Sequence, residues 1–150
     1  ALDARWKELQ REAHPDRFAA QGGAAQRLAM QWSVRINEAH QRLKDPVKRA
    51  AYLCEQRGSP INAETNTAMP PAFLMQQMEW RETLDDATKV EAVDALRTEV
   101  EMARALALSS LDRLIDEKGD YPAAAQQVRA LMFIERFADD VEAKTDHLGQ

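Results

Sequence analysis

The stretch that decides the fold is His14-Pro15-Asp16-Arg17-Phe18, which lies between two segments of helical hydrophobic periodicity. Pro15 has no backbone donor and disfavours helical geometry at His14, so the first helix is expected to end just before this stretch. Asp16 favours turns because its carboxylate accepts hydrogen bonds from nearby backbone amides. The sequence therefore predicts a stiff, exposed corner that carries an imidazole, a carboxylate and a guanidinium.

Apolar residues on both sides of this corner recur at steps of three and four, the spacing of one helical face. The stripe before the corner consists of Leu2, Trp6, Leu9 and Ala13. The stripe after it consists of Leu28, Trp32, Ile36, Ala39 and Leu43. Two such helices, joined by a polar loop of about ten residues, should pack antiparallel with Trp6 and Leu9 buried against the second stripe. Asp45-Pro46 is expected to end the second helix and start a third.

The second half of the chain shows helical patterns and no alternating run typical of a strand. Residues 58–71 are rich in Gly, Ser, Pro, Asn and Thr, which is typical of a loop, and Gly58 is expected to cap the helix before it. Three helices are expected over about residues 71–85, 88–118 and 121–147, with Asp120 as N-cap of the last. The fold class is therefore predicted to be all-α, with a three-helix bundle in the second half.

Charge is divided unevenly between the two halves. Residues 1–57 hold 11 Lys and Arg against 7 Asp and Glu, a net +4, whereas residues 58–150 hold 9 against 18, a net −9. Two modules of opposite charge favour two different protein partners. A nucleic-acid partner is not favoured, because the basic residues are dispersed without interleaved aromatics. A membrane partner is not favoured either, since no segment approaches the roughly 18 apolar residues of a span.

The residues that could bind metal are few. Cys54 is the only cysteine, and His14, His40 and His147 are widely spaced, so no metal-ligand pattern and no cofactor is predicted. A single cysteine forms no intramolecular disulfide, which suits a reducing cytoplasm. We interpret Cys54 as a small core residue.

Several segments resemble known co-chaperones. Those that resemble the J-domain family, in its order and at about its spacing, are His14-Pro15-Asp16, Ile36-Asn37-Glu38-Ala39 followed by Leu43, and Asp45-Pro46-Val47-Lys48-Arg49-Ala50-Ala51-Tyr52. Leu53 stands where the common J-domain ending has Asp, and Tyr52-Leu53 resembles the HscB branch, the J-domain co-chaperones of bacterial iron–sulfur cluster assembly. Residues 72–82 resemble the HscB segment that opens the C-terminal domain, and residues 128–133 resemble part of its last helix.

The resemblance covers the chain from Leu2 to about Leu148 and implies its organisation. Residues 1–57 would be a J domain, residues 58–70 a linker and residues 71–150 a scaffold-binding bundle. A further short helix would precede Ala1, so we interpret the J domain as N-terminally incomplete. The halves would form a rigid L if Tyr52 and Leu53 pack on the long helix, and two beads on a linker if they do not.

The resemblance also implies a chaperone-binding site. His14, Pro15 and Asp16 would contact the DnaK-like chaperone HscA and promote ATP hydrolysis there, so this chain would not itself be an enzyme. The cations that would steer toward an acidic partner surface are Arg5, Lys7, Arg11 and Arg17. For the helix cations, the alternative is an ordinary solvated basic face.

A second site lies at the start of the bundle. Periodicity alone leaves open whether Leu74 and Met78 are core residues; they would be exposed if Phe73, Trp80 and Leu84 face inward. An exposed Met and Leu patch with an acidic rim suits protein docking. The resemblance implies that the scaffold protein IscU is bound by Leu74, Met75, Met78, Glu79, Glu82, Asp86 and Phe133. Asp86 keeps the charge of a longer acidic residue in the family, while Arg81, Trp32 and Tyr52 are interpreted as structural.

Two alternatives remain open at this stage. One is a general J-domain co-chaperone for unfolded clients, which would lack a defined docking face. The other is an enzyme that uses His14 and Asp16 as an acid–base dyad. That enzyme would need a concave pocket around the two side chains, whereas a helix–helix corner is expected to be convex.

Overall fold

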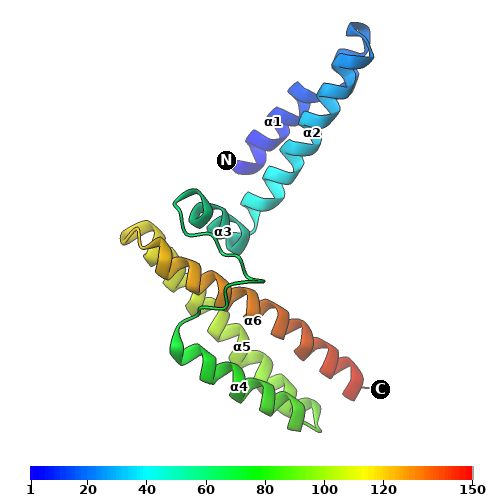
Figure 1. Ribbon diagram of the computed structural model, residues 1–150. Coiled ribbons are helices and arrows are strands. Elements are labelled where there is room, and N and C mark those ends of the chain that lie inside the picture. The colour runs from blue at the N-terminus through cyan, green and yellow to red at the C-terminus, as the bar shows by residue number, and fades with distance from the viewer. Residues whose placement is uncertain (150) are drawn as a thin grey trace. The chain divides into compact units, whose positions relative to one another are not determined.

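The computed structural model describes residues 1–149, which form α-helices joined by short connections (Figure 1). No β-strand occurs among these residues, which confirms the predicted all-α class. Two compact units divide the chain, Ala1–Arg49 (unit 1) and Ala50–Gln150 (unit 2). Within residues 1–149, none of the helices combines the length and the apolarity that crossing a membrane would need.

Unit 1 is an antiparallel hairpin of α1 (Leu2–Ala13) and α2 (Gly23–Lys44) (Figure 1). As predicted, α1 ends immediately before His14, whose ψ angle of 130° is extended. The connection is more ordered than the predicted polar loop, because Pro15–Gln21 forms a 3₁₀ helix. At Gly22 the chain adopts a φ angle of 101°, which glycine tolerates, and α2 starts at the next residue.

The seam between α1 and α2 is aromatic and polar. The Trp6 ring stacks on the buried His40 ring, with centroids 4.3 Å apart. Trp6 Nε1 donates to Asn37 Oδ1 at 2.9 Å, and Gln10 Nε2 donates to the same oxygen at 2.8 Å. His40 Nε2 lies 2.7 Å from a carboxylate oxygen of Asp3. Polar side chains of α1 and α2 therefore form hydrogen bonds with one another along the length of α1.

This seam corrects the predicted packing of unit 1. Leu28 and Trp32 were expected to be buried against α1, but both are more than half exposed. The reason is that α1 docks on the side of α2 that carries Asn37 and His40, which is a different helical face. Leu28 and Trp32 instead line an open apolar groove together with Leu9.

The third helix, α3 (Pro46–Gln56), begins as predicted. Asp45 Oδ1 accepts hydrogen bonds from the backbone amides of Val47 at 2.9 Å and Lys48 at 3.1 Å. Proline at the first helical position loses no helical bond there. After the helix, Gly58 has a φ angle of 82°, which is consistent with its predicted capping role.

Unit 2 contains the predicted three-helix bundle, formed by α4 (Pro71–Asp86), α5 (Val90–Asp112) and α6 (Tyr121–Leu148). The α5 and α6 helices run antiparallel and α4 lies along them (Figure 1). The α-helical part of α5 is shorter than predicted, because Arg113–Glu117 forms a π-helical turn. The next connection matches the prediction, since the Asp120 carboxylate accepts the Ala123 amide at 3.2 Å.

The core of unit 2 consists mainly of apolar residues that recur at helical spacing on its three bundle helices. Buried positions on α5 and α6 include Val93, Leu96, Val100, Ala107, Leu111, Val128, Leu131, Ile134 and Val141. From α4, Trp80 and Leu84 complete this core. Cys54 is fully buried, which confirms its interpretation as a core residue.

Residues 58–70 contain no helix, yet α6 holds them in place. The buried Arg129 donates from Nε to Ile61 O at 2.9 Å, from Nη1 to Ala68 O at 3.0 Å and from Nη2 to Pro60 O at 3.3 Å. One guanidinium therefore satisfies three carbonyl oxygens of the segment that leads into α4.

Candidate functional site

The His-Pro-Asp corner (His14, Pro15 and Asp16) is exposed at the end of α1. His14 Nδ1 accepts the backbone amide of Asp16 at 3.2 Å, which assigns the proton of the neutral imidazole to Nε2. The Asp16 carboxylate lies 3.7 Å from Nδ1, and 90% of its side chain is exposed. The corner thus offers a ring donor and a carboxylate to a partner.

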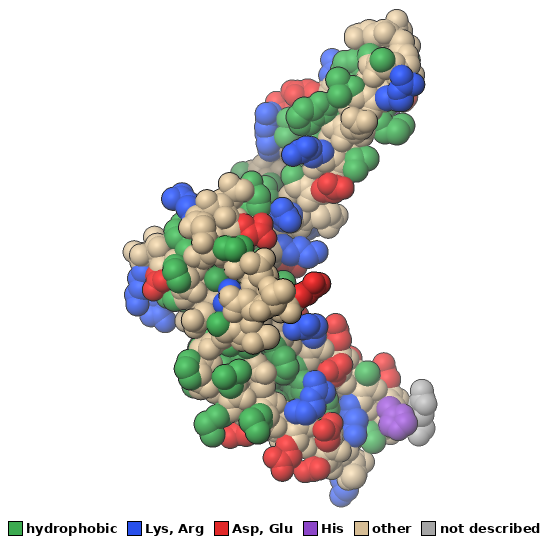
Figure 2. All heavy atoms as spheres, in the orientation of Figure 1, with side chains coloured by type: hydrophobic (Ala, Val, Ile, Leu, Met, Phe, Trp, Pro, Cys, Tyr) green, Lys and Arg blue, Asp and Glu red, His purple; other side chains and the backbone are tan. Residues whose placement is uncertain are grey.

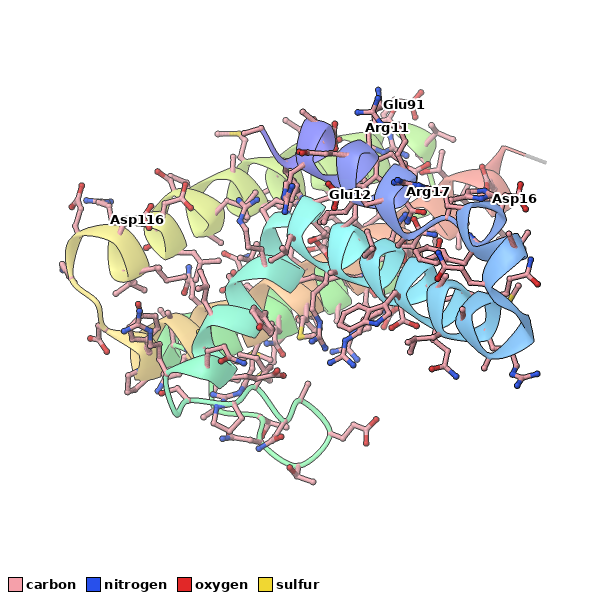
Figure 3. All side chains as sticks on the ribbon, turned by 90° about the horizontal axis from the view of Figure 1, so that it is seen from above. Arg11, Glu12, Asp16, Arg17, Glu91 and Asp116 are labelled. Carbon is pink, nitrogen blue, oxygen red and sulfur yellow. The ribbon has the colours of Figure 1, made fainter. Side chains whose placement is uncertain are left out.

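The predicted basic residues differ in their surroundings. Arg17 Nη1 donates to the backbone oxygen of Arg11 at 3.4 Å, so Arg17 ties the 3₁₀ helix to the end of α1. Figure 3 shows Arg11 on α1 with Asp16 and Arg17 on the following turn. Arg5 pairs with Glu8 at 3.0 Å on the helix surface, which offsets part of its charge. Lys7 and Arg11 are exposed.

The surface beside the corner carries two cationic side chains and an imidazole. An open hollow there is lined by Gln10, Arg11, His14 and Arg17. Among residues 1–149, no three His, Cys, Asp or Glu side chains are grouped as metal ligands would be. Two guanidinium groups around an imidazole instead suit contact with an acidic surface.

The second site is the α4 face, which comprises Leu74, Met75, Met78, Glu79, Glu82 and Asp86 together with Phe133 of α6. Leu74, Met75 and Met78 are all exposed, whereas Trp80 and Leu84 are buried. Periodicity left these two orientations open, and the structure decides for exposure of the Met and Leu side. Figure 2 shows hydrophobic side chains over the first part of α4 and acidic ones toward its end.

The acidic members of the α4 face are available for contact. Glu79, Glu82 and Asp86 are exposed, and none of them forms an ion pair among residues 1–149. They continue along the same helix beyond Met78, so the apolar patch has an acidic border. A partner with an apolar centre and a basic rim would complement this arrangement.

Phe133 joins the α4 face to the bundle through a closed set of four aromatic rings. It packs edge-to-face on Phe73 at 5.7 Å and parallel to Phe137 at 5.8 Å. Trp80 completes the set, 6.0 Å from Phe73 and 5.6 Å from Phe137. Phe133 remains half-buried, so it contributes both to the surface and to the core.

Three residues were interpreted as structural. Arg81 Nη2 lies 3.0 Å from Asp140 Oδ2, and its guanidinium lies over the Phe137 ring at 4.9 Å, as a structural role requires. Tyr52 is half-buried, whereas Trp32 is more than half exposed. Arg129 was missed by the sequence analysis, because no local pattern distinguishes an arginine that binds distant carbonyls from a solvated one.

Comparison with known proteins supplies the family. The model of the HSCB C-terminal oligomerisation domain matches residues 69–142. The co-chaperone protein HscB homolog of Burkholderia multivorans is 53% identical over 151 residues, covering 99% of this chain and 86% of the relative. The homolog of Bordetella pertussis is 51% identical over 143 residues, covering 95% of this chain and 84% of the relative.

Solved structures agree. Chaperone HscB from Vibrio cholerae has a TM-score of 0.79 and 34% identity, covering 98% of this chain and 88% of that one. Human co-chaperone protein HscB, with a TM-score of 0.85 and 23% identity, shares the fold over 95% of this chain and 72% of its own.

A J-type helical hairpin with an exposed His-Pro-Asp corner, followed by a three-helix bundle, defines a J-domain co-chaperone. The sequence identity to HscB homologs over nearly the whole chain shows which family of J-domain co-chaperones this is. The chain belongs to the HscB family of co-chaperones.

Proposed function

We propose that this chain carries the iron–sulfur scaffold IscU on the α4 face and delivers it to the DnaK-like chaperone HscA through the His-Pro-Asp corner. Membership of the HscB family supports this proposal. The observation that carries it is the exposure of Leu74, Met75 and Met78 on a helix whose opposite side is closed by Trp80 and Leu84. Exposed apolar residues of this size, grouped on one helix, favour protein docking.

The proposal assigns one task to each part of the chain. Residues 1–57 act as the J domain, residues 58–70 connect the parts, and residues 71–150 bind the scaffold. On HscA, the Asp16 carboxylate pairs with a cation, while Arg5, Lys7 and Arg11 attract an acidic surface. ATP hydrolysis takes place in HscA, so this chain is a stimulator and not an enzyme.

Linking the two binding sites on one chain raises the local concentration of scaffold at the chaperone. Hydrolysis is then triggered when the client is already present, which favours release of the cluster to acceptor proteins. The buried free thiol of Cys54 is compatible with a reducing compartment, and we assign this work to the cytoplasm.

Calorimetric titration with purified IscU tests the α4 face. The variant Leu74→Ala/Met75→Ala/Met78→Ala removes the exposed apolar centre without touching the aromatic set, and should bind IscU at least about tenfold more weakly. The matched control is Met102→Ala/Leu106→Ala, which removes two equally exposed apolar residues of α5. Equal losses in the two variants, or no binding by the parent, would reject the proposed face.

The His-Pro-Asp corner is tested by ATPase stimulation. His14→Gln replaces the imidazole by a polar side-chain amide, and it should abolish stimulation of HscA while IscU binding stays at the parental level. Asp16→Asn removes only the charge, and it should likewise abolish stimulation of HscA without changing IscU binding. If the parent chain stimulates HscA equally with unfolded peptides and with IscU, the general J-domain co-chaperone becomes the better description.

A further inference from the structure

The methionines of this chain fall into two groups by exposure. Met75 and Met78 are 67% and 74% exposed, and Met30 and Met102 are 58% and 63% exposed. Met69 and Met132 are half-buried, and Met69 Sδ accepts a hydrogen bond from Gln77 Nε2 at 2.9 Å. The two most exposed thioethers of the molecule therefore lie three residues apart on the α4 face.

Met75 and Met78 are more accessible to oxidants than the half-buried Met69 and Met132. Met75 and Met78 share one side of α4 with Leu74, and the surface over this part of the helix is apolar (Figure 2). An oxidant in solution reaches both sulfur atoms without any opening of the bundle. The same atoms are buried when an apolar partner docks, so their oxidation state affects the contact directly.

We propose that Met75 and Met78 form an oxidation-sensitive pair, and that peroxide converts the α4 face from an apolar to a polar surface that no longer holds the scaffold. This inference rests on the proposed scaffold-binding function. In the reaction, the O–O bond of hydrogen peroxide breaks and one oxygen bonds to Sδ. The other oxygen leaves as water with both peroxide hydrogens, so the thioether loses two electrons and becomes a sulfoxide.

A sulfoxide is a strong dipole with an acceptor oxygen. Its burial against an apolar partner without a donor costs binding free energy, and two such groups at the centre of the face should weaken IscU binding about tenfold or more. Folding of unit 2 should be unaffected, because neither side chain is part of the core. Reduction of both sulfoxides by methionine sulfoxide reductases restores the thioethers and should restore binding.

The experiment measures the dissociation constant for IscU before peroxide treatment, after it, and after reductase treatment. Mass spectrometry of the same samples locates each added oxygen. The proteins compared are the parent, Met75→Leu/Met78→Leu and Met102→Leu, and the quantity read for each is the ratio of its dissociation constants after and before oxidation. Circular dichroism follows the fold of each sample.

Support requires oxygen at Met75 and Met78 before Met69 and Met132, a ratio of about ten or more in the parent and in Met102→Leu, and recovery with the reductases. The Met75→Leu/Met78→Leu ratio should stay near one. An oxidised parent that binds as before would overturn the inference while leaving the scaffold function intact. A full loss that persists in Met75→Leu/Met78→Leu, or that the reductases cannot reverse, would also overturn it. An untreated parent that fails to bind IscU rejects the proposed function itself, and the inference falls with it.

Discussion

Arg129 Nε donates to the backbone oxygen of Ile61 over 2.9 Å, a bond between an α6 side chain and a segment 68 residues earlier in the chain. Two more bonds from the same guanidinium reach Pro60 and Ala68. No carboxylate among residues 1–149 pairs with this buried cation, so carbonyl dipoles alone compensate it. The segment before α4 is consequently a fixed part of unit 2.

Replacement of Arg129 should release this segment. Arg129→Met leaves three carbonyl oxygens to find water and should lower the free energy of unfolding by about 1–3 kcal/mol. Urea denaturation measures the loss, and limited proteolysis should show faster cleavage within residues 58–70. Arg136→Met, an exposed position on the same helix, serves as control and should change neither quantity. Unchanged cleavage in Arg129→Met would mean that the three bonds do not hold the segment.

Trp80 contributes through its ring and not through its indole N–H. The ring is buried and packs against Phe73 and Phe137, whereas Nε1 has no hydrogen-bond partner among residues 1–149. Trp80→Ala should therefore cost about 3–5 kcal/mol of unfolding free energy, as large cavities do. Trp80→Phe keeps an aromatic ring and loses no hydrogen bond, so it should cost clearly less. Similar losses in the two variants, measured by urea denaturation, would contradict this assignment.

Acid should destabilise the α1–α2 hairpin through Asp3. The hydrogen bond from His40 lowers the pKa of the Asp3 carboxyl below its ordinary value of 3.8 and outweighs the opposing effect of desolvation. Because the folded pKa is the lower one, the carboxylate stabilises the hairpin above the ordinary value, and this contribution disappears as pH falls through the folded value.

The comparison that tests Asp3 is between the parent and Asp3→Asn. Their free energies of unfolding should differ at neutral pH and converge in acid, because the protonated parent no longer has the anionic partner. Near-ultraviolet circular dichroism of the stacked Trp6 provides a local signal for the hairpin. A difference that is independent of pH would show that the Asp3 charge does not stabilise this seam.

The Cys54 thiol should be unreactive in the native protein. Burial raises its pKa above the ordinary value of 9.0, so the nucleophilic thiolate is disfavoured at neutral pH. Because the folded pKa is the higher one, the thiol favours the folded state fully at pH values below the ordinary pKa. This contribution to the free energy of unfolding is lost as pH rises from the ordinary pKa through the folded pKa. Alkylation by iodoacetamide should be slow and should accelerate with urea in step with unfolding. Rapid labelling of folded protein would contradict the burial of this thiol.

The sequence predicts those features that local chemistry determines. Pro15 dictates the end of α1, and the Asp45 and Asp120 carboxylates cap the helices that follow them. The orientation of α4 was left open by its periodicity, and the structure decides it: Trp80 is buried and Met78 is exposed on the other side of the helix. For the helix end and the two caps, the decisive interaction lies within about one turn of the residue that causes it.

Features that depend on contacts between distant residues were not predictable in this way. The apolar periodicity of α2 favoured burial of Leu28 and Trp32, but the helix surface that α1 contacts contains Asn37 and His40, whose polar groups are matched by α1 side chains. Arg129 likewise depends on carbonyl groups that fold back from a distant segment. Side-chain hydrogen bonds between helices produce no periodic pattern in the sequence of either helix, so hydrophobic periodicity does not predict them.

The α4 face contains residues of both α4 and α6, so binding at this face is coupled to the stability of the bundle. Phe133 reaches this surface only when α6 packs against Phe73, so a partner that contacts both helices binds the folded bundle and not the separated segments. By linkage, such a partner raises the melting temperature of unit 2, and the increase grows with the logarithm of the free partner concentration once this exceeds the dissociation constant. A bundle so destabilised that part of its population is unfolded would bind such a partner more weakly, because the apparent affinity falls with the folded fraction.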